Sequence, residues 1–216
     1  MVRLRCGIQG PFEDRRIPMR WLSHRWVKPV VFVLWLLPLG WLSWALWADR
    51  LGANPAEALI RSLGDWTLRA LVLLLAVTPL RVMAATPALA RLRRMLGLFV
   101  FFYASLHWLA YAWFDMGFEW PEVLADVSNR PFILVGTLAW LVLLVLAVTS
   151  FDRAIRTMGA KRWQWLHRSV YGLAGLALLH FYWMRAGKND FVEVVVYAVF
   201  VAVLLAWRAQ RRWCRR

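Results

Sequence analysis

The sequence is short of the residues that most often build metal centres and disulfide frameworks. It holds 2 cysteines and 4 histidines in 216 residues. Cys6 and Cys214 lie at opposite ends of the chain, so no paired spacing exists for zinc, an iron–sulfur cluster or a disulfide framework. We expect both cysteines to be free thiols.

Charged residues are also scarce, and apolar residues take their place. Charged residues make up 18% of the chain and hydrophobic residues 62%, whereas a soluble domain is usually about half apolar. The 16 tryptophans and 12 phenylalanines are typical of proteins whose aromatic rings collect at the lipid–water boundary. A formal charge of +15 can indicate nucleic-acid binding, but here the basic residues flank apolar segments and form no single solvated face. The composition therefore predicts an integral membrane protein in contact with lipid, with no nucleic-acid partner.

Signatures of several other classes are missing. No Gly-rich phosphate fingerprint follows a strand, and no segment has a strand pattern, so the chain alone is not an NAD(P)H-dependent reductase. The apolar run after Pro29 is too long for the core of a cleavable signal peptide. The pair Arg15-Arg16 is followed by Pro18 where a twin-arginine signal begins its hydrophobic stretch. We therefore expect no cleaved export signal.

Six apolar segments, each near the ~20 residues that a helix needs to cross a bilayer, organise the chain. They lie at about 30–47, 66–83, 95–114, 130–150, 165–185 and 191–207. We predict an all-α integral membrane protein with a six-transmembrane-helix bundle. The predicted domains are a basic N-terminal tail (1–29), the helical bundle (30–207) and a basic C-terminal tail (208–216).

The distribution of basic residues predicts the orientation. Most Lys and Arg residues fall in the N-terminal tail, 81–94, 151–168 and the C-terminal tail, and these four regions share one side of a six-helix arrangement. Cytoplasmic loops are enriched in Lys and Arg. We therefore predict that both tails are cytoplasmic. The opposite side carries an acidic loop with Asp115, Glu119, Glu122 and Asp126.

Three of the four histidines lie within the apolar segments, where an imidazole is costly and usually functional. At 1.5 Å per residue from the cytoplasmic entry, His107 is ~18 Å along the third segment and His180 is ~22 Å along the fifth. We expect the two imidazoles at similar depth, where they can clamp one iron axially, as helical bundles hold a b-type haem. His167 precedes His180 by ~20 Å on the same expected helix, so it cannot bind the same iron.

Other interpretations of these residues stay open. A single intramembrane histidine can be an interhelical hydrogen-bonding residue. A metal-only site is disfavoured, because no carboxylate or thiolate lies at the same depth. Small residues leave room for a flat macrocycle, although they equally allow close helix packing: Ala104, Gly172, Ala174, Gly175 and Ala177. His167 is either an inner-side ligand to another group or an interfacial histidine.

The chain resembles the MsrQ family in three stretches: RRMLGLFVFFYASLHWLAY (93–111), RPFILVG (130–136) and WQWLHRSVYGLAGLALLHFYW (163–183). That family comprises the haem-binding membrane subunits of periplasmic methionine sulfoxide reductase systems, within the ferric-reductase-like transmembrane group. The resemblance covers the chain from about residue 30 onward. It implies a b-type haem, with FMN also associated. It places His107, His167 and His180 at the three haem-ligand positions, which are the candidate iron ligands.

The resemblance also implies an electron conduit without a substrate-reducing site of its own. Electrons would pass from the quinone pool, or from a cytosolic flavin reductase, across the bacterial inner membrane. The acceptor would be a periplasmic molybdenum-containing methionine sulfoxide reductase that repairs oxidised proteins. The alternatives are a stand-alone ferric reductase or oxidase-like cytochrome, and a non-redox transporter or assembly factor with packing histidines.

The chain departs from the wider oxidase pattern at one point. Two-haem oxidases carry two histidines on each of two helices, but here the third segment has only His107. We expect one outer haem at His107 and His180, with His167 serving a second haem or an alternative ligation. Arg93 and Arg94 are candidates to contact a flavin phosphate, because Arg matches phosphate geometry. Candidates to neutralise haem propionates are Arg69, Arg130, Arg185 and Lys188.

Overall fold

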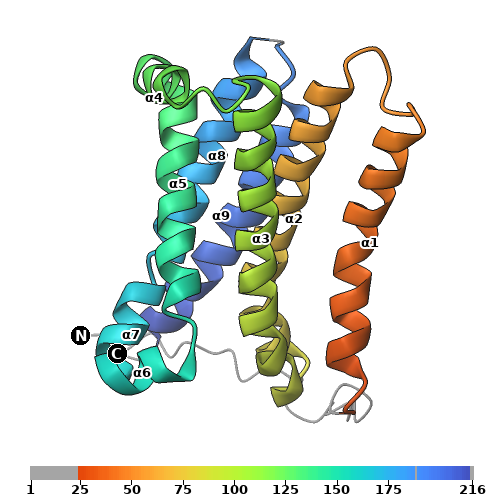
Figure 1. Ribbon diagram of the computed structural model, residues 1–216. Helices are drawn as coiled ribbons and strands as arrows, with labels where there is room; N and C mark the ends of the chain where they lie inside the picture. Colours follow the sequence, from red (N-terminus) through yellow and green to blue (C-terminus); the bar gives the residue numbers. More distant parts are fainter. Residues whose placement is uncertain (1–23, 188, 215–216) are drawn as a thin grey trace.

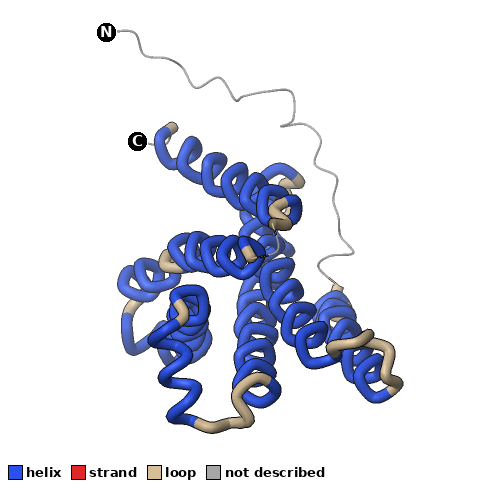
Figure 2. Tube along the Cα trace, turned by 90° about the horizontal axis from the view of Figure 1, so that it is seen from above, coloured by secondary structure: helices blue, strands red, loops and turns tan. Residues whose placement is uncertain are grey.

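The computed structural model describes residues 24–187 and 189–214, and over these ranges the chain consists of helices and loops without a strand (Figure 2). The all-α prediction is confirmed for this part of the chain. The elements are α1 (Val27–Trp47), α2 (Pro55–Met83), the 3₁₀ helix η2 (Pro87–Leu92), α3 (Arg93–Phe114), α4 (Trp120–Asn129), α5 (Pro131–Val148), α6 (Asp152–Met158), α7 (Ala160–His167), α8 (Val170–Ala186) and α9 (Val192–Trp213).

The long helices α1, α2, α3, α5, α8 and α9 run alongside one another in alternating directions (Figure 1). The connection from α1 to α2, the helix α4 and the connection from α8 to α9 lie at one end, which we call the α4 end. The helices α6 and α7 lie at the opposite end, which we call the α6 end. Helix α3 packs between α2 and α5, and α8 packs against α5 and α9. The helix α1 stands at the edge, where only Leu42 and Ala45 are buried.

Five segments are long and apolar enough to cross a bilayer: α1, α2, Pro87–Phe114, α5 and α9. A helix pairs its backbone N–H and C=O groups with each other, whereas the hydrocarbon of a bilayer offers them no hydrogen-bond partner. The sixth segment predicted to cross, α8, has 17 residues.

Two predicted segments begin elsewhere. Helix α2 starts at Pro55, well before the expected residue 66, because Asn54 Oδ1 accepts a hydrogen bond from the Glu57 amide at 3.1 Å and Pro55 suits the first helical position. In the fifth predicted segment a turn at 168–169 separates α7 from α8. His167 and His180 therefore lie on different helices, and the expectation that one helix carries both is wrong.

The short helices α4, α6 and α7 were not predicted, and α9 continues to Trp213, so that most of the expected 208–216 tail is helical. Cys214 is disulfide-bonded, so the expectation of a free thiol is wrong for this residue. Cys6 and most of the 1–29 tail lie outside the described residues.

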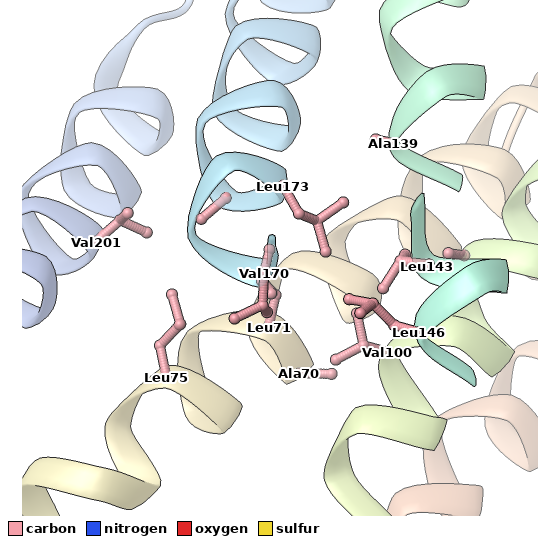
Figure 3. Packing of buried hydrophobic residues seen from close by; sticks show 12 residues of the cluster. Ala70, Leu71, Leu75, Val100, Ala139, Leu143, Leu146, Val170, Leu173 and Val201 are labelled. Carbon is pink, nitrogen blue, oxygen red and sulfur yellow. The ribbon is translucent and has the colours of Figure 1, made fainter. Parts of the chain in front are cut away.

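The largest buried cluster lies where α2, α3, α5, α8 and α9 meet (Figure 3). Leu71 and Leu75 of α2 face Val100 of α3, Leu143 of α5 and Leu173 of α8 across this cluster. These side chains form an apolar layer that separates the α4 end of the bundle from the α6 end.

A proline in α2 creates a gap that α9 fills. Pro79 has no N–H, so the carbonyl of Leu75, one turn earlier, lacks its usual helical donor. The guanidinium Nη2 of Arg208 donates to that carbonyl, and Nη1 donates to Leu204 O at 2.9 Å. The contact holds α9 against α2 and fixes the position of the Arg208 side chain.

Candidate functional site

A cavity of about 300 Å³ lies toward the α4 end between α2, α3, α5 and α8. His107 of α3 and His180 of α8 both line it, and their ring centroids are 6.1 Å apart with an angle of 78° between the ring planes. Both side chains are half-buried, because part of each ring borders the cavity. We call this space the histidine cavity.

Each imidazole is held by a backbone carbonyl of a neighbouring helix. His107 Nδ1 lies 2.8 Å from Ile60 O of α2, and His180 Nδ1 lies 2.7 Å from Phe132 O of α5. A carbonyl oxygen can only accept, so each Nδ1 carries the hydrogen and each Nε2 keeps its lone pair. Metal-ligating histidines typically donate their other ring N–H to a carbonyl or carboxylate in this way. Both rings are thus set in the tautomer that a metal requires.

Two glycines make room for these rings. A Cβ on Gly64 would lie 3.1 Å from His107 Cε1, and a Cβ on Gly136 would lie 2.8 Å from His180 Nδ1. Gly64 follows Ile60 by four residues, and Gly136 follows Phe132 by the same interval. The same local arrangement therefore occurs on α2 and on α5. In each helix a backbone carbonyl accepts a hydrogen bond from the imidazole, and one turn later a glycine leaves room for the ring.

The spacing of the two rings fits two ligands of one metal. Metal–imidazole bonds of about 2 Å place the centroids of two opposed rings roughly 6 Å apart, close to the observed 6.1 Å. A metal bound by side chains alone needs three or four of them, and the part of the chain that the structure describes has no group of three or more His, Cys, Asp or Glu able to hold one. A haem brings four ligands of its own and takes two from the protein, so two histidines on one cavity are compatible with it.

Arginines with acidic partners line the rim of the cavity. Arg61 pairs with Glu57 at 2.5 Å. Arg130 Nε pairs with Asp126 Oδ1 at 2.8 Å. Tyr111, also on the rim, donates from its hydroxyl to the other Asp126 oxygen at 2.7 Å. The rim therefore presents cations whose charge is largely balanced by neighbouring carboxylates.

Of the arginines and lysine expected to neutralise propionates, the structure brings only Arg130 to the cavity. Arg69 lies over the Trp66 ring at 4.7 Å from its centroid. Arg185 is bonded to Asp190 and Glu193. Lys188 lies outside the described residues, and Arg61 was missed because its segment was expected to be a loop.

One wall of the cavity consists of stacked indoles. Trp108 and Trp140 both line it, with centroids 5.3 Å apart and ring planes 16° from parallel. Trp140 Nε1 donates to Ser105 Oγ at 3.0 Å. The stack continues from Trp108 to Trp120 of α4 at 6.3 Å, and Trp120 is 55% exposed. An aromatic contact therefore links the cavity wall to the surface at the α4 end.

His167 lies in a second, smaller space at the α6 end. A pocket of about 90 Å³ is lined by His167 together with Arg93, Arg94 and Arg208, and we call it the basic pocket. The His167 ring stacks on Trp163 at 4.1 Å, and its Nε2 lies 3.2 Å from Thr149 Oγ1. The apolar layer separates it from the other two histidines, so the structure brings His107 and His180 together and leaves His167 apart.

The small residues that were expected to leave room for a macrocycle fall into two groups. Ala104 and Ala177 line the histidine cavity. Gly172 and Gly175 do not line it, and a Cβ on either would meet nothing within 4 Å. Besides Arg61, sequence reasoning missed Gly64 and Gly136. For Gly136 the signal was a glycine inside a predicted apolar helix, which costs helix stability and so needs a compensating reason. Gly64 gave no such signal, because the second predicted segment began at residue 66.

Comparison with known proteins gives a consistent match. The model of the family "Ferric reductase like transmembrane component" matches residues 63–178. A protein of Polaromonas naphthalenivorans named "Protein-methionine-sulfoxide reductase heme-binding subunit MsrQ" is 60% identical over 196 residues, covering 91% of this chain and 90% of its own. Proteins of the same name from Herminiimonas arsenicoxydans and Bordetella pertussis are 49% and 50% identical, each covering 88% of this chain and 87% and 92% of their own. No solved structure matches.

Proposed function

The chain belongs to the MsrQ family within the ferric-reductase-like transmembrane proteins, and from this premise we propose that it is a multi-pass membrane b-type cytochrome that delivers electrons to a methionine sulfoxide reductase. The observation that carries the proposal is the pair His107 and His180, with Nδ1 of each ring bound to a backbone carbonyl and both rings on one cavity. It is an electron-transfer subunit, and the reduction of methionine sulfoxide takes place on its partner.

Haem b is the cofactor of the proposal, and His107 and His180 are the residues that would hold its iron. When bound, the haem supplies one-electron redox chemistry between ferric and ferrous iron. The protein sets the ligands, their hydrogen bonds and the burial, which are its means of tuning the cofactor. We assign no haem to His167, because the basic pocket has less than a third of the volume of the histidine cavity.

We propose six membrane crossings with both termini cytoplasmic, in the bacterial inner membrane. Helix α8 has 17 residues, which lies at the lower end of the range for a crossing helix. It joins the α6 end to the α4 end, where α9 begins (Figure 1). The excess of Lys and Arg at the α6 end supports a cytoplasmic position for that end. The histidine cavity then lies in the outer half of the membrane.

The electron donor of the proposal is quinol or a cytosolic flavin reductase, and the acceptor is a periplasmic molybdenum-containing methionine sulfoxide reductase. FMN, with Arg93 and Arg94 as contacts for its phosphate, belongs to the proposal on family resemblance. The acceptor docks at the α4 end, where Trp120 links the surface to the cavity wall. The acidic loop around α4 gives this surface its charge, so the docking face of the acceptor is basic.

The proposal is tested with the purified protein and its partner. The protein should show a Soret band whose position shifts on reduction, and reduced protein should be reoxidised by the partner with methionine sulfoxide present. Reversing Glu119 and Glu122 to Lys should slow this reoxidation several-fold at low salt and leave the spectrum unchanged. A purified protein without a Soret band would refute the cytochrome. Reoxidation by a ferric chelate but not by the partner would favour the stand-alone ferric reductase.

A further inference from the structure

Helix α2 carries a row of charged side chains that runs from the α4 end into the interior of the bundle. Glu57, Arg61, Asp65 and Arg69 follow one another at intervals of four residues, so they share one face of the helix and alternate in sign. Glu57 and Arg61 form an ion pair at 2.5 Å, and the Arg69 guanidinium lies over the Trp66 ring. Charged side chains are rare within membrane-spanning helices and are usually functional there. The row therefore calls for a functional explanation.

Asp65 has no direct partner in the part of the chain that the structure describes, where no hydrogen bond or ion pair involves it. The charges that act on it come from Arg61 and Arg69 of α2, Arg185 of α8 and Glu193 of α9. Arg61 and Arg185 are already in ion pairs with other carboxylates. Arg69 is therefore the main counter-charge for an ionised Asp65.

Asp65 lies between the histidine cavity and a groove that α1 and α2 form, and it lines both spaces. It follows Gly64, beside which the His107 ring lies, so Asp65 is at the level of that ring. The expectation that no carboxylate lies at the depth of the histidines is therefore wrong, because α2 begins well before residue 65. Asp65 is not among the charges that act on His107 or His180. It can respond to a charge in the cavity without being a ligand there.

Polar side chains line the cavity between Asp65 and the α4 end. Arg61 and Glu57 lie one and two turns nearer that end and border the same cavity. In the other direction the apolar layer, which includes Leu71 of the same helix, separates Asp65 from the α6 end. Among the described residues, α1 contributes no titratable side chain to the groove. A proton that binds Asp65 therefore comes from the α4 end.

We propose that Asp65 takes up one proton when a cofactor in the histidine cavity gains one electron, and releases the proton when the electron leaves. This inference rests on the proposed haem. An added electron makes the cavity more negative, and in a medium of low dielectric this favours the neutral form of a nearby carboxyl group.

The step balances in protons and electrons. An electron from the donor reduces ferric to ferrous iron, while the Asp65 carboxylate takes a proton from water at the α4 end and an O–H bond forms. When the acceptor takes the electron, this O–H bond breaks and the proton returns to the same end. The negative charge of each electron is thus compensated without a proton crossing the membrane.

The coupling has a definite sign. Because the reduced state binds the proton more tightly, a bound proton favours reduction by the same factor, and the midpoint potential falls as the pH rises. For one electron, a tenfold change in proton concentration lowers the potential by up to about 59 mV. In Asp65→Asn the side chain is neutral at every pH. Its potential should therefore not depend on pH, and it should equal that of the wild type at low pH.

Spectroelectrochemical titration of the full-length protein in detergent, repeated over a range of pH, tests the coupling. The variants are Asp65→Asn and Asp65→Glu, of which the second keeps a carboxylate. The matched control is Asp190→Asn, which removes a carboxylate that pairs with Arg185 but lines neither the cavity nor the groove. A second readout is the infrared difference spectrum between reduced and oxidised protein, which shows the C=O band of a protonated carboxylic acid.

We expect the potential to fall with pH in the wild type, Asp65→Glu and Asp190→Asn, and to stay constant in Asp65→Asn. The carboxylic acid band should appear on reduction of the first three proteins and be absent from Asp65→Asn. A difference in potential between the wild type and Asp65→Asn that is the same at every pH would overturn the proposal, because Asp65 would then be a permanently charged partner of Arg69. An equal pH dependence in these two proteins would also overturn it, because the titrating group would lie elsewhere.

Failure of this inference can be told apart from failure of the proposed function. A wild type with a Soret band and a potential that does not depend on pH would refute the role of Asp65 and leave the cytochrome standing. A wild type without a Soret band would refute both.

Discussion

The two spaces in the bundle both contain a histidine, yet they are built in opposite ways. In the histidine cavity each imidazole is held by a carbonyl and rests on a glycine, and the rim arginines have acidic partners. In the basic pocket His167 stacks on an indole and contacts a hydroxyl, and of the three arginines that line it Arg94 pairs with a carboxylate, that of Asp152. The first arrangement leaves two imidazole nitrogen lone pairs free for the proposed haem iron, whereas the second gathers positive charge.

The apolar layer makes this division possible. Leu143 lines both spaces, with Leu71, Val100 and Leu173 on the side of the histidine cavity and Leu146 on the side of the basic pocket. Apolar side chains exclude water and lower the local dielectric, which strengthens electrostatic interactions on either side. The two spaces can therefore hold different groups without sharing a polar contact. Four predictions test or sharpen the contrast.

The largest effect is expected from the histidines themselves. His107→Ala or His180→Ala removes one of the two proposed haem ligands and should abolish the Soret band of the purified protein. His167→Ala should retain full haem content, because its ring lies in the basic pocket. Haem per chain, measured by pyridine haemochrome, compares the three. Loss of haem in His167→Ala to the same extent as in His180→Ala would show that the two spaces are not independent.

The sequence allowed the pairing of His107 with His180 to be predicted from depth alone, because the regular rise of a helix converts residue counts into heights. It did not allow the position of His167 relative to His180 to be predicted, because the break at 168–169 lies in a stretch whose aromatic residues extend the apolar pattern past it. The groups that hold each imidazole could not be predicted either. Every residue has a backbone carbonyl, so the sequence does not show which one accepts a hydrogen bond from an imidazole. The role of a glycine becomes clear only when the side chain packed against it is known.

The second prediction concerns the glycines against which the imidazoles rest. Gly136→Ala would place a Cβ 2.8 Å from His180 Nδ1 and force that ring to move, whereas the contact at Gly64 is 3.1 Å and more easily relieved. Changes to groups that orient a metal ligand typically cost 10–100-fold in affinity, and we expect about this loss of haem affinity for Gly136→Ala. A smaller loss is expected for Gly64→Ala.

The matched control for these variants is Gly172→Ala, whose Cβ would meet nothing within 4 Å. It should bind haem like the wild type, with helix stability higher by up to about 1 kcal/mol. Transfer of haem to an apoglobin measures the affinity, and the reduction potential gives a second readout that depends on ring orientation. Equal affinity and potential in Gly136→Ala and Gly172→Ala would contradict the role of the glycine.

The third prediction concerns Arg208, which serves the fold as well as the basic pocket. Pro79→Ala supplies the missing N–H for Leu75 O, so this carbonyl no longer depends on the guanidinium. Arg208→Gln should therefore destabilise the wild type by about 1 kcal/mol more than it destabilises Pro79→Ala, the usual net contribution of one hydrogen bond. The difference is measured by thermal unfolding in detergent of four proteins: the wild type, Pro79→Ala, Arg208→Gln and the double variant. Additive effects would mean that the contact between Arg208 and Leu75 contributes nothing to stability.

The smallest effect is expected at the rim of the histidine cavity. The Arg130 side chain is 56% exposed and already paired with Asp126, and exposed ion pairs contribute about 0.2–1 kcal/mol. Arg130→Gln should therefore weaken haem binding by no more than about fivefold, even if Arg130 contacts a propionate. Arg93→Gln should affect phosphate binding more strongly, because no carboxylate among the described residues pairs with Arg93. Haem transfer and phosphate titration on both variants compare the two arginines. The contrast would be reversed if Arg130→Gln lost more haem affinity than Arg93→Gln lost phosphate affinity. The excess positive charge would then act at the histidine cavity and not at the basic pocket.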